Sequence, residues 1–304
     1  MKEPVKNIPA SILARLKNQA EMTERPFAEI LQYYAMERFL YRLSKTRYAE
    51  KFILKGGLLF YVWNLPLRRS TRDIDFRGYV SNSRENLLKV INDVITQSAP
   101  EDGIIFDPQS VSVEETQIDS DYQGIRVKVT ALLERSRIPI QIDIGFSDEL
   151  TSKAETIEYP NILSDLKTTR MRGYPKEAVV AEKFHAMVRH AELNSRMKDY
   201  YDLWLLSETF EFKGASVQIA IESTFKKRNT EIPSERPLSL SDEFAQTSQS
   251  LWTNFLNKME LENNQVIDFQ DVIEKIWGFL QLPIQASVNK TKSTRNWIPR
   301  KGWQ

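Results

Sequence analysis

Residues 138–146, with the sequence IPIQIDIGF, carry isoleucine at every second position. Strict alternation with a period of two is the pattern of a β-strand that has one buried face. The isoleucines therefore predict a strand in a sheet covered on one side, with Gln141 and Asp143 on the opposite, polar face. Taken alone, Asp143 is equally compatible with an exposed acid on an edge strand.

A pair of aspartates occupies a second predicted strand. In the stretch DIDF, Asp73 and Asp75 flank an isoleucine, so their side chains share one face with Cα atoms about 6 to 7 Å apart. Three acids on one sheet face repel each other unless a cation neutralises them. Together with Asp143 the pair therefore predicts a metal site, and carboxylate oxygens favour Mg²⁺. The alternative for the pair is a solvated strand end with ion pairs to nearby arginines such as Arg72.

Two glycines precede the aspartate pair. Gly56 and Gly57 follow the predicted strand KFIL and open the apparent helix LLFYVWN. Backbone N–H groups at such a turn can approach a phosphate group. A tight packing turn between strand and helix is the alternative, and the pair is not a P-loop because no Gly-Lys-Ser/Thr follows.

The period of the hydrophobic pattern changes along the chain. Helical spacing dominates residues 11–47, and strand patterns dominate residues 52–147 except for a helix predicted at 83–97. Residues 148–175 carry proline and glycine and are expected to be loop-like. Helical spacing returns over residues 176–281, interrupted by one polar loop.

These changes predict an α/β (α+β) fold with two domains and a tail. Residues 1–150 are expected to form a mixed sheet flanked by helices, including two N-terminal helices. Residues 151–285 are expected to form a helical domain that closes over the cleft. Residues 286–304, which hold five Lys or Arg and no acid, are expected to be a flexible basic tail.

Composition limits the possible partners. The chain of 304 residues balances 42 basic against 41 acidic residues, so nucleic-acid binding requires local patches and not a global positive field. The absence of cysteine excludes disulfides and thiolate chemistry. No apolar run reaches membrane-spanning length, and the first residues lack the pattern of a signal peptide. We therefore expect a cytoplasmic protein that does not interact with membranes.

Four segments together resemble successive motifs of the AbiEii/AbiGii toxin family, within the DNA polymerase beta type nucleotidyltransferase superfamily. In chain order they are KGGLLFYVWNLPLRRSTRDIDF, Asp143 in IQIDIGF, AVVAEKFHAMVRH and SRMKDYYDLWLL. The resemblance implies a nucleotidyltransferase-like sheet domain followed by a helical domain. It also implies that three aspartates bind magnesium and the nucleoside triphosphate, namely Asp73, Asp75 and Asp143.

The resemblance assigns roles to helical residues as well. The third motif contributes Lys183, and the fourth contributes Asp199 and Asp202, which share a helix face because they are three residues apart. Lys183 and Asp202 are expected to join the three aspartates in catalysis. The residues expected to bind the nucleotide are Gly56, Gly57, Arg72, Lys183 and Asp199. The alternative for Lys183 is a salt bridge between helices with one of its two aspartates.

The activity that the resemblance implies is transfer of a nucleotide from a nucleoside triphosphate to an acceptor hydroxyl. It further implies a toxin of a toxin–antitoxin or phage-defence system, with a cognate antitoxin encoded nearby. Because some members of the family modify the 3′ end of tRNA, a tRNA is the expected acceptor.

One departure from the family pattern keeps other functions open. The family usually has Ser or Thr directly after the glycine pair, whereas this chain has Leu58. A non-catalytic module that binds RNA or protein is therefore one alternative, and a metal-dependent ribonuclease is another, because it also needs clustered carboxylates. His185 and His190 are five residues apart and lie on different helix faces, so a zinc site is not expected.

Overall fold

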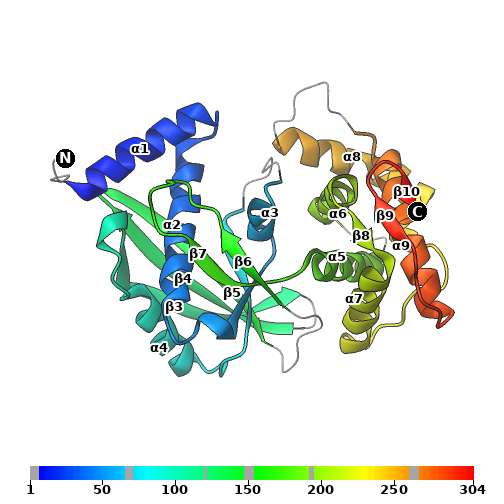
Figure 1. Cartoon of the computed structure of the whole chain (residues 1–304), viewed down its shortest axis with the longest axis horizontal. Helices are drawn as coiled ribbons and strands as arrows, with labels where there is room; N and C mark the ends of the chain where they lie inside the picture. Colours follow the sequence, from blue (N-terminus) through cyan, green and yellow to red (C-terminus); the bar gives the residue numbers. More distant parts are fainter. Residues whose placement is uncertain (1–6, 66–70, 120–121, 147–153, 192–194, 260–266) are drawn as a thin grey trace. The chain divides into compact units, whose positions relative to one another are not determined.

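The structure is a computed structural model that describes residues 7–65, 71–119, 122–146, 154–191, 195–259 and 267–304. These residues form two compact units, the first ending at Tyr174 and the second beginning at Pro175. The first unit contains a seven-stranded mixed sheet with helices, and the second is mainly helical (Figure 1). This architecture confirms the predicted fold class. Within the described ranges, no helix has both the length and the apolar character needed to cross a bilayer.

The sheet of the first unit has the strand order β3-β4-β5-β2-β1-β7-β6. Its strands are β1 (Phe52–Lys55), β2 (Asp73–Gly78), β3 (Ile105–Asp119), β4 (Tyr122–Leu133), β5 (Ser136–Phe146), β6 (Glu155–Tyr159) and β7 (Thr169–Gly173). The central strands β2 and β5 are parallel, as are β1 and β7, whereas the other neighbours are antiparallel. The strand pattern predicted over residues 52–147 is therefore confirmed.

The central strands have one apolar and one polar face, as a period of two requires. Ile74 and Phe76 of β2 are almost fully buried, as are the four isoleucines of β5. Helix α2 (Phe27–Ser44) covers this apolar face, where its Phe39 ring meets the ring of Phe106 on β3 edge to face, with centroids 6.0 Å apart. The polar residues between these positions are thereby directed to the opposite face of the sheet.

Three further helices complete the first unit. They are α1 (Ile8–Met22), α3 (Leu58–Val62) and α4 (Arg84–Ile95). Ser83 caps the N-terminus of α4, where its hydroxyl accepts a hydrogen bond from the Asn86 N–H, and the buried residues of the helix recur at helical spacing. Helices α1, α2 and α4 confirm the helices predicted from the hydrophobic period.

Helix α2 also carries buried charges into the first unit. The guanidinium of Arg42 donates two hydrogen bonds to the carboxylate of Asp102, at 2.6 and 3.1 Å. Glu37, which is fully buried, pairs with the neighbouring Arg38 and accepts a hydrogen bond from the Ile162 N–H at 2.8 Å. Burial raises the pKa of Glu37 to about 7, even though Arg38 lowers it.

Residues 148–175 were expected to be loop-like, and the described part of this segment corrects that expectation. Strands β6 and β7 form an antiparallel pair, and β7 continues the sheet by pairing with β1. The first unit therefore extends to Tyr174, beyond the boundary expected at residue 150. The reason is that both strands are short and alternate buried with charged positions, so their apolar signal is weak.

The second unit follows the expected helical pattern. Its helices are α5 (Lys176–His190), α6 (Met197–Thr209), α7 (Gly214–Lys227), α8 (Asp242–Lys258) and α9 (Phe269–Val288). A loop with one short 3-10 helix (Leu238–Leu240) separates α7 from α8, which agrees with the predicted polar interruption. A small sheet adds three strands, β8 (Phe212–Lys213), β9 (Asn296–Ile298) and β10 (Gly302–Trp303).

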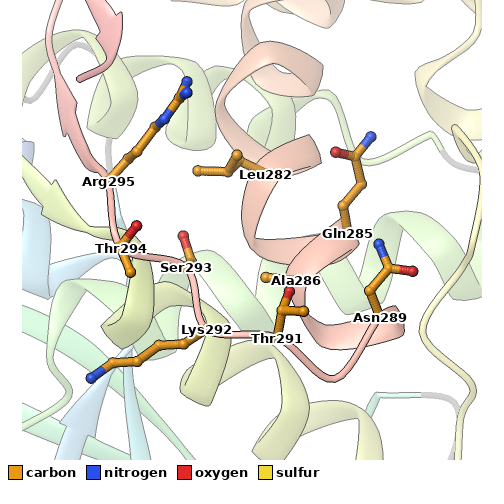
Figure 2. A pocket seen from close by; sticks show the side chains of 9 residues that line it. All are labelled: Leu282, Gln285, Ala286, Asn289, Thr291, Lys292, Ser293, Thr294 and Arg295. Carbon is orange, nitrogen blue, oxygen red and sulfur yellow. The ribbon is translucent and has the colours of Figure 1, made fainter.

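The C-terminal segment is part of this second unit and is not the flexible tail that was expected. Strand β9 pairs with β8 and β10, and Trp297 on β9 is 3% exposed. The Trp303 indole donates to backbone carbonyl groups of α9 at 3.1 and 3.2 Å. Burial of these aromatic rings holds the segment in place. A cavity of about 230 Å³ lies between it and α9, and Lys292 and Arg295 line its wall (Figure 2).

Candidate metal and nucleotide site

The three predicted aspartates lie on adjacent parallel strands of the first unit. Asp73 and Asp75 are the first and third residues of β2, and Asp143 is on β5. The register pairs Asp75 with Asp143 directly, and Asp73 with Gln141. Asp73 and Asp75 are partly exposed, whereas Asp143 is 5% exposed. Alternation in both strands therefore brings all three side chains to the polar face, as the sequence predicts.

The carboxylates are close enough to share a cation. Each of the three residues offers an oxygen, and these oxygens lie within 4.8 Å of one another. Among the described residues, no other group of three or more acidic, histidine or cysteine side chains has this arrangement. Oxygen donors alone suit magnesium better than zinc. The donor set is therefore consistent with a divalent hard cation.

The glycine pair lies directly against the aspartates. Gly56 has a φ of +69°, and a Cβ built at this position would be 1.9 Å from Asp75 Oδ2. A Cβ at Gly57 would be 2.3 Å from Thr71 Oγ1. Both the left-handed backbone and the close approach therefore require glycine at position 56. The turn therefore brings backbone beside the Asp75 carboxylate.

Leu58 follows this turn as the first residue of α3 and is 1% exposed. It belongs to the core and provides no polar group at the position where the family resemblance led us to expect a hydroxyl. The nearest hydroxyl to Gly57 is that of Thr71, which is 5% exposed and whose N–H donates to the Tyr33 hydroxyl at 2.9 Å. Leu58 therefore contributes an apolar side chain to the core and no hydroxyl to the glycine turn.

Arg126 and Gln141 are site residues that the sequence reasoning missed. Arg126 Nε and Nη2 donate to Asp143 Oδ1 and Oδ2, each at 2.8 Å. Gln141 Nε2 also donates to Asp143 Oδ2, at 3.1 Å. The hydrogen bond to Asp143 raises the pKa of Arg126, so the guanidinium remains charged. The sequence did contain a signal for Arg126, because alternation in the segment GIRVKVT puts its side chain on the polar face of β4. Its contact with Asp143, however, depends on the register between β4 and β5.

The same register places charges in a row across the sheet. Lys55 of β1 is in register with Asp75, which is followed by Asp143 of β5 and Arg126 of β4. One acidic pair is thus flanked by a basic residue on each side. Because opposite charges reduce the repulsion between neighbouring carboxylates, this row allows the pair to exist without a bound metal ion.

The predicted helical residues form a separate cluster in the second unit. Lys183 Nζ on α5 lies 2.7 Å from Asp199 Oδ1 and 2.7 Å from Asp202 Oδ2, both on α6. Arg196 Nε donates to Asp199 Oδ2, also at 2.7 Å. Burial alone would raise the pKa of Asp199, but Lys183 and Arg196 outweigh it and lower the pKa to about 2. The salt bridge between helices, left open by the sequence, is therefore present.

The structure adds little on the role of the remaining residues singled out in the sequence, which are Arg72 and the two histidines. Arg72 is exposed, and its carbonyl accepts a hydrogen bond from Gln32 Nε2 at 3.3 Å. The neighbouring arginines at positions 68 and 69 lie outside the described residues. His185 is fully buried and its Nε2 lies 3.0 Å from Thr230 Oγ1, whereas His190 ends α5. The two histidines belong to no metal-binding group among the described residues.

The comparison with solved structures found matches to proteins from Helicobacter pylori. A crystal structure of JHP933 from Helicobacter pylori has a TM-score of 0.49 and 18% identity, covering 86% of this chain and 94% of that chain. Another H. pylori structure, of a protein classed provisionally as a nucleotidyltransferase, has a TM-score of 0.48 and 18% identity, covering 86% and 96% respectively. The comparison with curated proteins found no significant match.

A family match covers most of the sequence. Residues 38–275 match the family described as nucleotidyl transferase AbiEii toxin, type IV TA system. The matched region contains the glycine turn, the three aspartates and the Lys183 cluster. The chain therefore belongs to the AbiEii family of nucleotidyl transferase toxins of type IV toxin–antitoxin systems.

Proposed function

We propose that the chain is a magnesium-dependent enzyme that transfers a nucleotide from a nucleoside triphosphate to a hydroxyl group of RNA. The observation that carries this proposal is the convergence of three carboxylate oxygens within 4.8 Å beside a glycine turn. Family membership supports nucleotidyl transfer as the reaction. A purely structural role would not require three like charges on one sheet face.

The aspartates would hold the metal ions of the reaction. Asp73 and Asp75 would hold both ions, and Asp143 would hold the one next to the attacking hydroxyl. When bound, magnesium would neutralise charge on the transferring phosphate and lower the pKa of that hydroxyl. The protein's contribution is to fix the carboxylates on two paired strands, so that the backbone that carries them is already in place when a metal ion binds.

The triphosphate would be held by backbone and by basic side chains. The Gly56 backbone lies beside Asp75, and the N–H groups of such a turn are suited to phosphate oxygens. Arg72 is exposed and directly precedes Asp73 in the sequence. Lys183 is proposed as a further ligand on the family resemblance alone, with Asp199 and Asp202 orienting its ammonium group.

The proposed reaction forms one bond and breaks another. The acceptor oxygen bonds to the α-phosphorus, the bond from this phosphorus to the β-phosphate oxygen breaks, and pyrophosphate leaves. The hydroxyl proton passes to solvent. We propose the 3′ end of a tRNA as the acceptor, which places the reaction in the cytoplasm, and a cognate antitoxin as the regulatory partner of this toxin. Phage defence would be one outcome of such a system.

One observation favours a second candidate function. Leu58 is buried in place of the usual hydroxyl, and Asp143 is already neutralised by Arg126. A non-catalytic protein that retains the fold and binds RNA or protein would tolerate both features. A metal-dependent ribonuclease also remains a candidate because it would use the same carboxylates.

One experiment separates these functions. The purified protein is incubated with total RNA, magnesium and each labelled nucleoside triphosphate in turn, and the RNA is resolved by size. Nucleotidyl transfer predicts label in RNA that disappears when magnesium is chelated. Shortening of RNA without any triphosphate would identify a ribonuclease. Unchanged RNA together with intact triphosphate would favour the non-catalytic module.

A further inference from the structure

Asp143, the most buried of the three aspartates, is already bound to a cation within the protein. Arg126 donates to both of its carboxylate oxygens at 2.8 Å, in the planar two-pronged geometry that guanidinium groups form with carboxylates. Gln141 donates to one of these oxygens as well. A metal ion that takes an oxygen of Asp143 must therefore compete with Arg126 for it.

Arg126 is placed so that it can leave. Its side chain is 33% exposed, compared with 8% for the side chain of Asp143. Within the described residues, Asp143 is its only hydrogen-bond and ion-pair partner. The neighbouring basic residue on the same face, Lys128, pairs instead with Glu114 at 3.1 Å. Loss of the Asp143 contact would thus leave the Arg126 guanidinium available for another anion.

We propose that Arg126 is an internal counter-ion that couples metal binding to triphosphate binding. It neutralises Asp143 before the metal ion arrives, releases the carboxylate when magnesium binds, and then donates to a phosphate oxygen of the triphosphate. This inference rests on the proposed function, because it assumes that the aspartates bind magnesium. The guanidinium is suited to both partners, because its planar pair of N–H donors matches the oxygens of a phosphate as well as those of a carboxylate.

Such an exchange makes magnesium and triphosphate bind cooperatively. Magnesium alone must break an ion pair, whereas magnesium with triphosphate gives the freed guanidinium a new partner. The same coupling must act in both directions, because binding free energies are linked. Arg126 is accordingly a positioning residue in the metal-free protein and a ligand of the triphosphate in the complex.

The test measures magnesium affinity by titration calorimetry in the full-length protein and in Arg126→Gln. Without nucleotide, we expect Arg126→Gln to bind magnesium about tenfold more tightly, a change of about 1.4 kcal/mol. At saturating magnesium, we expect it to bind a triphosphate analogue with a non-hydrolysable α–β bridge about tenfold more weakly. Arg126→Lys keeps the positive charge but loses the paired N–H donors, so its affinities for magnesium and for the analogue should lie between those of the unmodified protein and of Arg126→Gln.

The matched control is Lys128→Gln, which removes the same charge from the same strand and face. It should change the magnesium affinity by less than twofold, because Lys128 contacts Glu114 and not the aspartates. An equal change in both variants would identify a general charge effect and overturn the role of Arg126. Unchanged or weaker magnesium binding in Arg126→Gln would overturn it too.

Asp75→Asn separates this inference from the proposed function. If Asp75→Asn abolishes magnesium binding while Arg126→Gln leaves it unchanged, the metal site stands and the counter-ion role fails. If the unmodified protein binds no magnesium, or Asp75→Asn does not weaken the binding, both the metal site and the counter-ion role are overturned. A structural role of Arg126 alone would lower the melting temperature without tightening magnesium binding.

Discussion

Replacing Lys183 by alanine removes the cation from a buried ion-pair cluster. The ammonium group lies 2.7 Å from each of two carboxylates, on Asp199 and Asp202, whose side chains are only 1% and 2% exposed. Breaking a buried ion pair by removing one partner typically costs about 3 to 5 kcal/mol, because the remaining charge loses its compensation. The geometry therefore predicts a large loss of stability in a variant without ligand.

The pKa of Asp199 gives a second indication of how much stability the Lys183→Ala variant should lose. Its pKa is lowered from 3.8 to about 2 although burial opposes this change, so the interaction with its cations exceeds the cost of burying the charge by roughly 2 kcal/mol. Part of this remains in the variant, because Arg196 still donates to Asp199. We expect Lys183→Ala to lose about 2 to 4 kcal/mol, or roughly 5 to 15 °C in melting temperature.

The assay compares thermal unfolding of Lys183→Ala with that of Lys198→Ala, which removes an exposed lysine of α6. Equal, small losses in both variants would refute the argument from the buried pair. The same instrument tests the proposed ligand role through the rise in melting temperature on adding magnesium and triphosphate. Loss of one charge-assisted contact of roughly 1.5 to 3 kcal/mol should reduce that rise. An undiminished rise would remove Lys183 from the nucleotide ligands.

Three further changes follow from the geometry. Gly56→Ala should destabilise the protein by about 1 to 3 kcal/mol and weaken magnesium binding, because its Cβ would collide with Asp75. The control is Gly278→Ala, at a helical position with open space around the added Cβ, which should change neither stability nor magnesium binding. Calorimetry compares the two variants. Glu37 has a pKa raised from 4.5 to about 7, so the stability it contributes below about pH 4.5 should fall by up to about 3 kcal/mol as the pH rises to about 7. Urea denaturation should show that Glu37→Gln removes this dependence; an unaltered pH profile would contradict the assignment. Trp297→Ala should lose about 3 to 5 kcal/mol on thermal unfolding because the ring is 3% exposed, whereas a loss below about 1 kcal/mol would mean that the C-terminal segment is dispensable.

Much of the sheet and the candidate site could be predicted from local patterns. The alternating isoleucines of β5 determine which face is buried, and the same period directs Asp143 to the polar face. The spacing of Asp73 and Asp75 does the same on β2. The burial patterns anticipated the shared polar face, whereas the parallel register of β2 and β5, which brings the three carboxylates together, is seen only in the structure.

The parts that were missed depend on pairings that no local pattern contains. Strands β6 and β7 alternate with charged residues and acquire their place only by joining β1. The basic composition of the C-terminal segment masked Trp297, whose burial requires β8 and α9 as partners. Arg126 was on the predicted face, but its contact with Asp143 depends on the register of a hairpin.

The most direct test of the central claim is labelled-nucleotide transfer to RNA by the unmodified protein and by Asp75→Asn, which lies between Gly56 and Asp143 in the site. We expect magnesium-dependent incorporation of label by the unmodified protein and none by the variant, with both proteins folded at the assay temperature. Comparable incorporation by the two proteins would contradict the claim that the three aspartates are the metal site of this enzyme.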